Sequence, residues 1–189
     1  MSGLFVDDAL GSFPGSLPLS AINLSGASLG QRPSIIVNFK SWATGCAKPS
    51  TCGVLVSDTG LQQGQGMHGS FSRADTANFM AAYGPDFKSG FVDPAPASNA
   101  DIGKTIVAIL GLLPMEHGKL VGRPLAEAFP NGMVPAFEKK TLVSEPSAAG
   151  GLATILNYQT VGDTKYFDAA GFSGRTLGLS APSTASNRD

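Results

Sequence analysis

The stretch SNADIGKTIVAILGLL, residues 98–113, predicts the clearest helix of the chain, over Asn99 to Leu113. Ser98 followed three residues later by Asp101 is the pattern that caps a helix N-terminus, and the carboxylate also suits the positive end of the helix dipole. Apolar side chains recur at helical spacing at Ile102, Ile106, Ile109, Leu110 and Leu113. This apolar stripe is expected to pack on a sheet, so it predicts core and an α/β fold.

Short apolar runs on both sides of this helix predict the strands. The compact β-branched run Ser34 to Phe39 indicates a strand buried on both faces. Val161-Gly162-Asp163-Thr164 is typical of a hairpin turn. A second, shorter helix is expected from Arg123 to Phe129, with Pro124 in its first turn. Further strands are expected at residues 54–57, 78–83, 140–143, 154–160 and 165–169.

The composition and the predicted secondary structure change along the sequence and predict three regions. Residues 1–132 carry the predicted α/β layer, and residues 133–179 are predicted to form a β-hairpin-rich appendage. Residues 180–189 are polar, with no apolar period, and predict a disordered tail.

The amino-acid composition limits the kinds of partner (protein, nucleic acid or membrane) that this chain is expected to bind. Hydrophobic residues make up 42% of the chain, enough for a core, but charged residues make up only 14%, well under the usual quarter. Much of the surface is therefore expected to be covered by other protein. The net charge is −1, from 13 basic and 14 acidic residues without a run of either sign, so the sequence predicts no nucleic-acid patch. No apolar stretch has the length of a membrane span.

Cys46 and Cys52 bracket a turn-rich insert and could close a small disulfide loop. Two unpaired thiols are the alternative. Zinc binding by this pair is disfavoured, because the spacing is longer than in a zinc knuckle and no second Cys or His pair is near.

One of the two histidines, His68, stands in the glycine-rich loop GQGMHGSFSR, residues 64–73. Glycine neighbours leave the backbone uncrowded, so a metal ion or a phosphate could approach the imidazole closely. From spacing alone, a histidine that only hydrogen-bonds locally remains the alternative. The loop lacks the Gly-Lys-Ser/Thr ending of a phosphate-binding loop, so nucleotide binding through that motif is rejected.

Four stretches carry a family resemblance, and they read SIIVNF (34–39), DTGLQQGQGMHGSFSRADT (58–76), MAAYGPDFK (80–88) and GFVDPAPASNAD (90–101). They resemble the C-terminal part of the alkaline phosphatase superfamily, in particular the bacterial type I phosphodiesterases and nucleotide pyrophosphatases. The resemblance implies that residues 1–132 are part of an α/β/α sandwich of the alkaline phosphatase type. It also implies that His68 is one ligand of a two-metal site, with zinc as the expected cofactor.

The same resemblance implies parts that these residues lack. Members of the family carry a Ser or Thr nucleophile, an Asp-x-x-x-His pair and an Asp-His-Gly element upstream of the matched region, and the sequence contains neither histidine element. We therefore expect a C-terminal segment of a metal-dependent phosphoric ester hydrolase, without catalytic residues of its own and inactive alone. Its partners would be the missing N-terminal part and a small phosphate ester substrate. The complete protein would be periplasmic or secreted.

Two other functions stay open. The chain could be a free-standing non-catalytic module with the same partial fold. It could also be a metal-free serine hydrolase that uses Ser70 or Ser72 with His68, although the loop supplies no Gly-x-Ser-x-Gly elbow. Ser72 is expected instead to cap a short turn ending near Asp75.

The second histidine, His117, lies in a Glu-His-Gly sequence that superficially resembles a metal element. It follows the predicted helix in a glycine-rich linker. A role at the negative end of that helix is therefore favoured over metal binding.

Overall fold

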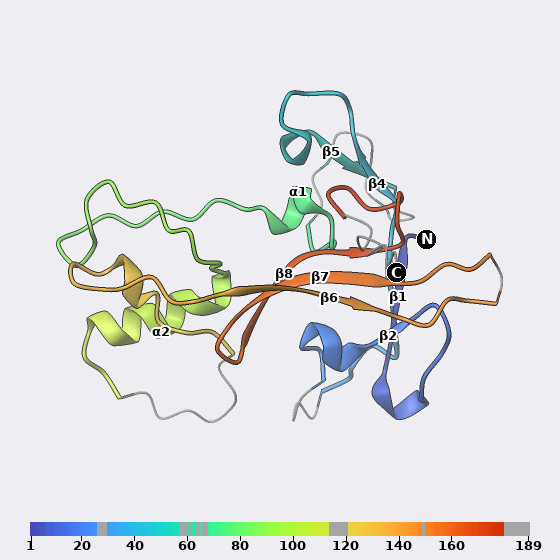
Figure 1. Cartoon of the computed structure of the whole chain (residues 1–189), viewed down its shortest axis with the longest axis horizontal. Coiled ribbons are helices and arrows are strands. Elements are labelled where there is room, and N and C mark those ends of the chain that lie inside the picture. The colour runs from blue at the N-terminus through green and yellow to red at the C-terminus, as the bar shows by residue number, and fades with distance from the viewer. Residues whose placement is uncertain are drawn as a thin grey trace, which may run out of the picture. The chain divides into compact units, whose positions relative to one another are not determined.

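The computed structural model describes residues 1–25, 30–56, 60, 62, 65, 68–113, 121–148 and 150–179. These residues form short helices and strands in small separate sheets, a mixed arrangement of the general α/β class (Figure 1). They pack as two units. Unit 1 comprises Met1–Asn78, Thr141–Asn157 and Phe167–Asp189, and unit 2 comprises Phe79–Lys140 and Tyr158–Tyr166.

Unit 1 is built around strand β1, Gly3–Val6, which pairs in parallel with β2 and antiparallel with β3. Phe5 is fully buried at the centre of this sheet and lies opposite Leu17 and Ile36. The other elements of this part of the unit are β2 (Leu17–Pro18), β3 (Ile35–Asn38) and the 3-10 helices η1 (Asp8–Leu10) and η2 (Leu19–Ile22).

A second small sheet of unit 1 is the antiparallel hairpin of β4, Ser41–Ala43, and β5, Gly53–Leu55. The 3-10 helix η3, Pro49–Thr51, lies in its connection. Helix α1, Arg73–Thr76, follows. Strand β5 begins one residue before the predicted 54–57 segment.

The last three strands form one sheet of order β6-β7-β8. Strand β6 spans Glu138–Val143, β7 spans Ile155–Val161 and β8 spans Thr164–Gly171. The turn at Gly162-Asp163 joins β7 to β8, as the hairpin pattern predicted, and Gly162 takes a positive φ of 53° there.

Residues late in the chain complete unit 1 by packing on its first strand. The Thr154 hydroxyl donates to Gly15 O at 2.6 Å and accepts from the Leu4 N–H at 3.1 Å. A Cβ added to Gly3 would lie 2.7 Å from Gly171 Cα, so only glycine allows this approach of the two backbones. Unit 1 thus joins the first residues of the chain to residues 154–171.

Three expectations about local structure are wrong. Residues 78–83 form no strand, and Tyr83 is fully exposed. The second predicted helix is reduced to the 3-10 helix η4, Ala126–Ala128. Strand β3 is present where Ser34 to Phe39 predicted one, but it is not buried on both faces, since Ile35 is 55% exposed.

Helix α2, Asn99–Ile109, is present with the predicted capping box. The Ser98 N–H donates to Asp101 at 2.8 Å, and the Ser98 side chain accepts from the Ala100 N–H. The helix ends earlier than predicted, at Ile109. Leu110 is its C-cap, and Gly111 follows with a positive φ of 61°.

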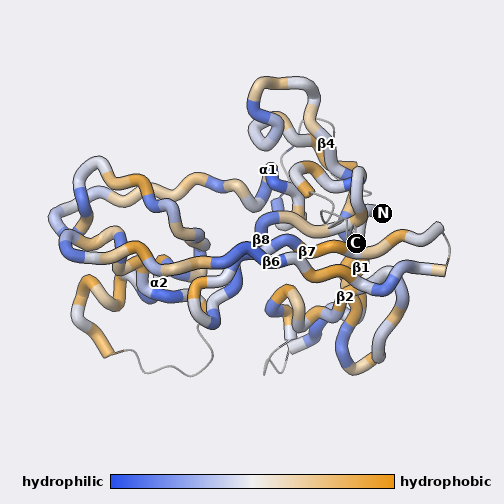
Figure 2. Tube along the Cα trace, in the orientation of Figure 1, coloured by the Kyte–Doolittle hydropathy of each residue, from blue (hydrophilic) through white to orange (hydrophobic). Residues whose placement is uncertain are grey.

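The expectation that the apolar stripe of α2 is core is wrong, because the polar face of the helix is buried and the apolar face is exposed. Ile106 is 50% exposed, and Leu113 beyond the helix is 95% exposed. The buried positions are the polar ones, Asp101 and Thr105. Hydrophobic residues recur along the trace of both units in Figure 2 and do not gather in one element.

The burial of the polar face of α2 follows from its hydrogen bonds. Asp101 Oδ1 accepts from the Arg123 N–H at 2.8 Å and from the Tyr166 hydroxyl at 3.2 Å. Thr105 Oγ1 donates to Asp101 O at 2.8 Å and accepts from the Leu125 N–H at 3.0 Å. Buried polar groups are tolerated when they are hydrogen-bonded in this way. The amides of the segment 121–125 therefore favour burial of the polar face of α2 over its apolar face.

None of the described helices is long and apolar enough to cross a membrane.

Replacing Asp101 by Ala should destabilise unit 2 strongly. The change removes the helix cap and the charged acceptor of the Arg123 amide and the Tyr166 hydroxyl, which together cost about 3 kcal/mol. Ile106→Ala, on the exposed face, should change the free energy of unfolding by less than about 0.5 kcal/mol. Urea unfolding followed by circular dichroism measures both. A larger loss for Ile106→Ala than for Asp101→Ala would contradict this orientation of α2.

Candidate functional site

His68 lies exposed on the loop that leads into α1. No hydrogen bond joins its imidazole to another of the described residues. Gly69 follows with a φ of 97°, a conformation that favours glycine, and no atom lies within 4 Å of the position that a Cβ would take. The imidazole is thus free to bind a group that approaches from outside the described part of the chain.

The end of the loop is closed by a local turn. The Ser70 N–H donates to Asp75 Oδ2 at 2.7 Å, and the Ser72 N–H donates to Ser70 Oγ at 3.2 Å. Ser72 Oγ accepts from the Ala74 N–H at 3.0 Å and caps α1, as the sequence predicted. Ser72 is also buried, so its hydroxyl is poorly placed to act as a nucleophile.

Backbone contacts seat this turn on the rest of unit 1. The Phe71 N–H donates to Asn38 Oδ1 at 3.4 Å, and Phe71 O accepts from the Ala170 N–H at 3.0 Å. The Phe71 ring packs between the rings of Phe5 and Phe167, with centroid distances of 5.2 and 6.0 Å. The segment after His68 is therefore fixed to β1, β3 and β8.

Helix α1 has its own attachments. The Arg73 N–H donates to Leu177 O at 2.9 Å, and the Arg73 guanidinium pairs with Asp168 at 3.3 Å. The Thr76 hydroxyl donates to Asp168 O. These bonds hold a helix of only four residues, which would not be stable in isolation.

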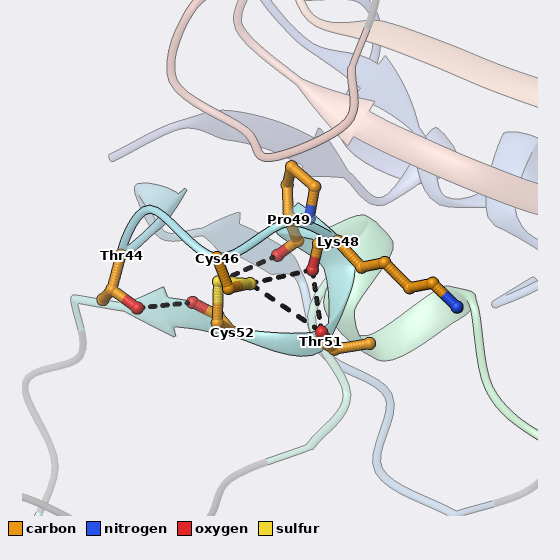
Figure 3. The surroundings of a disulfide bond; sticks show 6 residues. All are labelled: Thr44, Cys46, Lys48, Pro49, Thr51 and Cys52. Carbon is orange, nitrogen blue, oxygen red and sulfur yellow. Dashed lines mark hydrogen bonds between the residues drawn. A yellow bond between two sulfur atoms is a disulfide. The ribbon is translucent and has the colours of Figure 1, made fainter.

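The hairpin of β4 and β5, which a disulfide closes (the disulfide hairpin), packs against α1. Cys46 and Cys52 are joined by a disulfide, and the Thr51 hydroxyl donates to Lys48 O at 2.8 Å inside the loop that the bond closes (Figure 3). A Cβ added to Gly53 would lie 2.5 Å from Ala74 Cβ, so β5 packs directly against α1. The cross-linked hairpin is thus part of the support of the turn after His68.

Among the described residues, no three His, Cys, Asp or Glu side chains come together as a group that could hold a metal ion. His68 is thus a single candidate ligand, and the Asp75 carboxylate, seven residues later in the sequence, is engaged with the Ser70 amide. His117 lies outside the described residues.

A hollow of about 270 Å³ in unit 1 is lined by residues on and between β1 and β2. Its one charged lining side chain, Asp8, accepts from the Ser20 N–H at 3.0 Å and from the Ser20 hydroxyl. The hollow therefore offers no free titratable group for catalysis.

Sequence reasoning missed a polar cluster in unit 2. Arg123 and Glu127 form a bidentate ion pair, with Nη1–Oε2 2.8 Å and Nη2–Oε1 2.5 Å, and Glu127 is only 1% exposed. The guanidinium also lies over the Tyr166 ring, 5.8 Å from its centroid. The four-residue spacing of Arg123 and Glu127 was the one signal in the sequence.

Burial and hydrogen bonds shift the pKa values of the acidic groups in and around this cluster. Burial alone would raise the pKa of Glu127, but the hydrogen bonds from Arg123 outweigh it and the pKa is lowered. Burial, together with the neighbouring Glu127 carboxylate, raises the pKa of Asp93. Burial raises the pKa of Tyr166 as well, and the Asp101 carboxylate adds to the shift. Arg123 and Glu127 neutralise each other, although Arg123 Nε is buried without a hydrogen-bond partner among the described residues, so the arrangement fits a structural role.

No family model, curated protein or solved structure matches this chain.

Replacing Cys46 and Cys52 together by Ser should lower the free energy of unfolding by about 2 kcal/mol, the chain-entropy value for so short a loop. Urea unfolding of the oxidised protein and of the double variant measures the difference. Adding a reductant to the wild type should give the same loss and should leave the variant unchanged. Equal stability of all samples would contradict a contribution from the disulfide.

Replacing Glu127 by Gln should cost about 3 kcal/mol at pH 7, because the buried Arg123 guanidinium loses its charged partner. The lowered pKa of Glu127 means that its stabilisation is complete above the unfolded pKa of about 4.5 and is lost as the pH falls through the lower folded value. The stability difference between wild type and variant should therefore shrink below pH 4.5. Urea unfolding at pH 7, 5 and 3 measures it, and a difference independent of pH would contradict the ion pair.

Proposed function

We propose that this chain is the C-terminal segment of a metal-dependent phosphoric ester hydrolase of the alkaline phosphatase type. His68 contributes one ligand to its two-metal site, with zinc as the metal. The observation that carries the proposal is the His68 loop, where an exposed, unengaged imidazole stands next to a firmly seated turn. Metal ligands need such support, since a side chain held loosely binds a metal weakly.

The exposed apolar surface supports the view that further protein covers this chain in the complete enzyme. In unit 1, Ile35 and Val37 of β3 are exposed, and in unit 2, Ile102 and Ile106 of α2 are exposed. In a sandwich such residues lie between the sheet and its helices. The low content of charged residues also fits a surface that further protein covers.

His68 suits a metal because a neutral imidazole offers a nitrogen lone pair, which zinc prefers along with carboxylate and thiolate ligands. In the complete site, two metal ions would polarise the phosphoryl oxygens and position the nucleophile. The nucleophile and the other ligands would come from the N-terminal part of the same protein. The segment alone, with one candidate ligand, should not hydrolyse phosphate esters.

The disulfide supports a place for the protein in an oxidising compartment. Cys46 and Cys52 are paired, and no free cysteine remains in the sequence. Disulfides persist in secreted and periplasmic proteins and are rare in the cytosol. We therefore place the complete hydrolase in the periplasm or outside the cell.

Replacing His68 by Ala in the product of the whole reading frame that encodes this chain should abolish most phosphate ester hydrolysis. The expected loss in kcat is on the order of 100-fold or more, because even groups that only support a metal ligand are worth 10- to 100-fold. Hydrolysis of nitrophenyl phosphate mono- and diesters and the zinc content per molecule are the measurements. His117→Ala is the matched control and should retain the wild-type rate and zinc content.

Each alternative gives a different result in this assay. A His68→Ala protein with the wild-type rate and zinc content would overturn the proposal. Activity that survives a chelator would favour the metal-free serine hydrolase. A product of the whole reading frame without hydrolytic activity would favour the non-catalytic module.

A further inference from the structure

The loop before α2 meets η4 through two carboxyl groups. Asp93, half-buried in this loop, and Glu127, only 1% exposed on η4, are hydrogen-bonded to each other through their side chains. An ionised carboxylate accepts hydrogen bonds and donates none, so a hydrogen bond between two carboxyl groups exists only while one of them carries a proton. One member of this pair is therefore a carboxylic acid that donates to the other.

Glu127 is the ionised member of the pair, because both of its oxygens accept from Arg123. The Nη1–Oε2 distance is 2.8 Å and the Nη2–Oε1 distance is 2.5 Å. A bidentate guanidinium stabilises the charged form of a carboxylate. Glu127 is almost wholly removed from water, where an ionised carboxylate needs such a partner.

Asp93 has no comparable partner. Its Oδ1 accepts from the Ala95 N–H at 2.9 Å. The side-chain N–H groups of Arg123 donate to Glu127 and to two backbone carbonyl oxygens, and the buried Nε has no hydrogen-bond partner in the part of the chain that the structure describes. Asp93 is thus the member of the pair that retains the proton.

The charged and titratable groups around the pair are engaged with one another. Asp101 on α2 accepts from the backbone N–H of Arg123 and from the hydroxyl of Tyr166 on β8, and the guanidinium lies over the Tyr166 ring. Lys88 Nζ donates to two backbone carbonyl oxygens in and after η4, at 2.9 and 2.6 Å. Burial outweighs the attraction of the Arg123 charge and raises the pKa of Asp93.

We infer that the contact between Asp93 and Glu127 is a pH-sensitive switch of unit 2: a protonated Asp93 joins residues 93–97 to η4, and an ionised Asp93 repels Glu127 and loosens this segment. Two like charges at hydrogen-bond distance repel each other strongly when they are shielded from water. Arg123 Nη2 also donates to Pro96 O at 3.1 Å, so the change is local. The inference goes beyond the proposed function and does not rest on it.

The direction of the pH dependence follows from Asp93. Burial raises its pKa in the folded chain above the ordinary value of 3.8, so the folded chain binds this proton more tightly than the unfolded chain does. The stabilisation that Asp93 contributes is therefore complete below pH 3.8 and is lost as the pH rises through the folded value. Glu127, whose pKa is lowered, shows the opposite dependence.

Urea unfolding of this chain between pH 3 and pH 8 compares wild type with Asp93→Asn. Asparagine keeps the oxygen that accepts from the Ala95 N–H and offers an amide N–H to Glu127, but it does not ionise. As the pH rises above 3.8, the folding constant of wild type should fall relative to that of Asp93→Asn, by up to about 10-fold per pH unit, until the folded Asp93 is ionised.

Two further variants control this comparison. Asp163→Asn changes an exposed carboxylate in the turn between β7 and β8, and the ratio of its folding constant to that of wild type should not depend on pH. Asp93→Ala keeps neither hydrogen bond, so its folding constant should be about 5-fold or more below that of Asp93→Asn at every pH.

Carbon NMR of the Asp93 side-chain carboxyl follows its proton directly. In wild type this carboxyl should titrate above pH 3.8, and in Glu127→Gln it should titrate at a lower pH than in wild type because the neighbouring negative charge is gone. A ratio of wild-type to Asp93→Asn folding constants that stays the same from pH 3 to pH 8 overturns the inference. An Asp93 carboxyl that titrates at or below pH 3.8 in wild type overturns it as well.

Discussion

The buried carboxylate of Asp101 determines how unit 2 is put together. It caps α2 and accepts hydrogen bonds from the Arg123 amide and the Tyr166 hydroxyl. A carboxylate removed from water needs several donors, and these two come from separate segments that follow the helix in sequence. Once they converge on Asp101, the polar face of α2 has to face inward. The apolar stripe of α2 is exposed as a consequence, and part of the surface of unit 2 is therefore hydrophobic.

Local features were predictable from sequence, and the direction of burial was not. The capping box of α2, the turn at Gly162-Asp163 and the cap at Ser72 each depend on residues within a few positions, and all three are present. Helical periodicity says that one face is apolar but not what covers it, and for α2 the polar contacts decided. The predicted strand at 78–83 failed for a related reason, because an extended segment becomes a strand only when another strand pairs with it.

At the candidate site, too, local features were predictable from the sequence and contacts between distant segments were not. The glycines around His68 marked a loop able to present an imidazole, and the structure places that side chain on an exposed loop. The supports of the loop could not be read from spacing, because Asn38 lies 33 residues before Phe71 and Asp168 lies 95 residues after Arg73. The Arg123–Glu127 pair was also missed, although both residues fell in one predicted helix. Pairing between distant segments is decided by the whole fold, whereas a cap or a turn is decided locally.

The return of residues late in the chain to strand β1 has a consequence for biosynthesis. Thr154 bonds to Gly15 and Leu4, and the buried Ser2 hydroxyl donates to Arg175 O at 2.8 Å, so β1 is completed only when residues near 175 are available. Contacts of such large sequence separation form slowly, since the intervening chain must first be closed into a loop. While the polypeptide leaves the ribosome, β1 lacks these late contacts for most of the synthesis of this chain. A chaperone that binds extended apolar segments would have its longest opportunity at this strand.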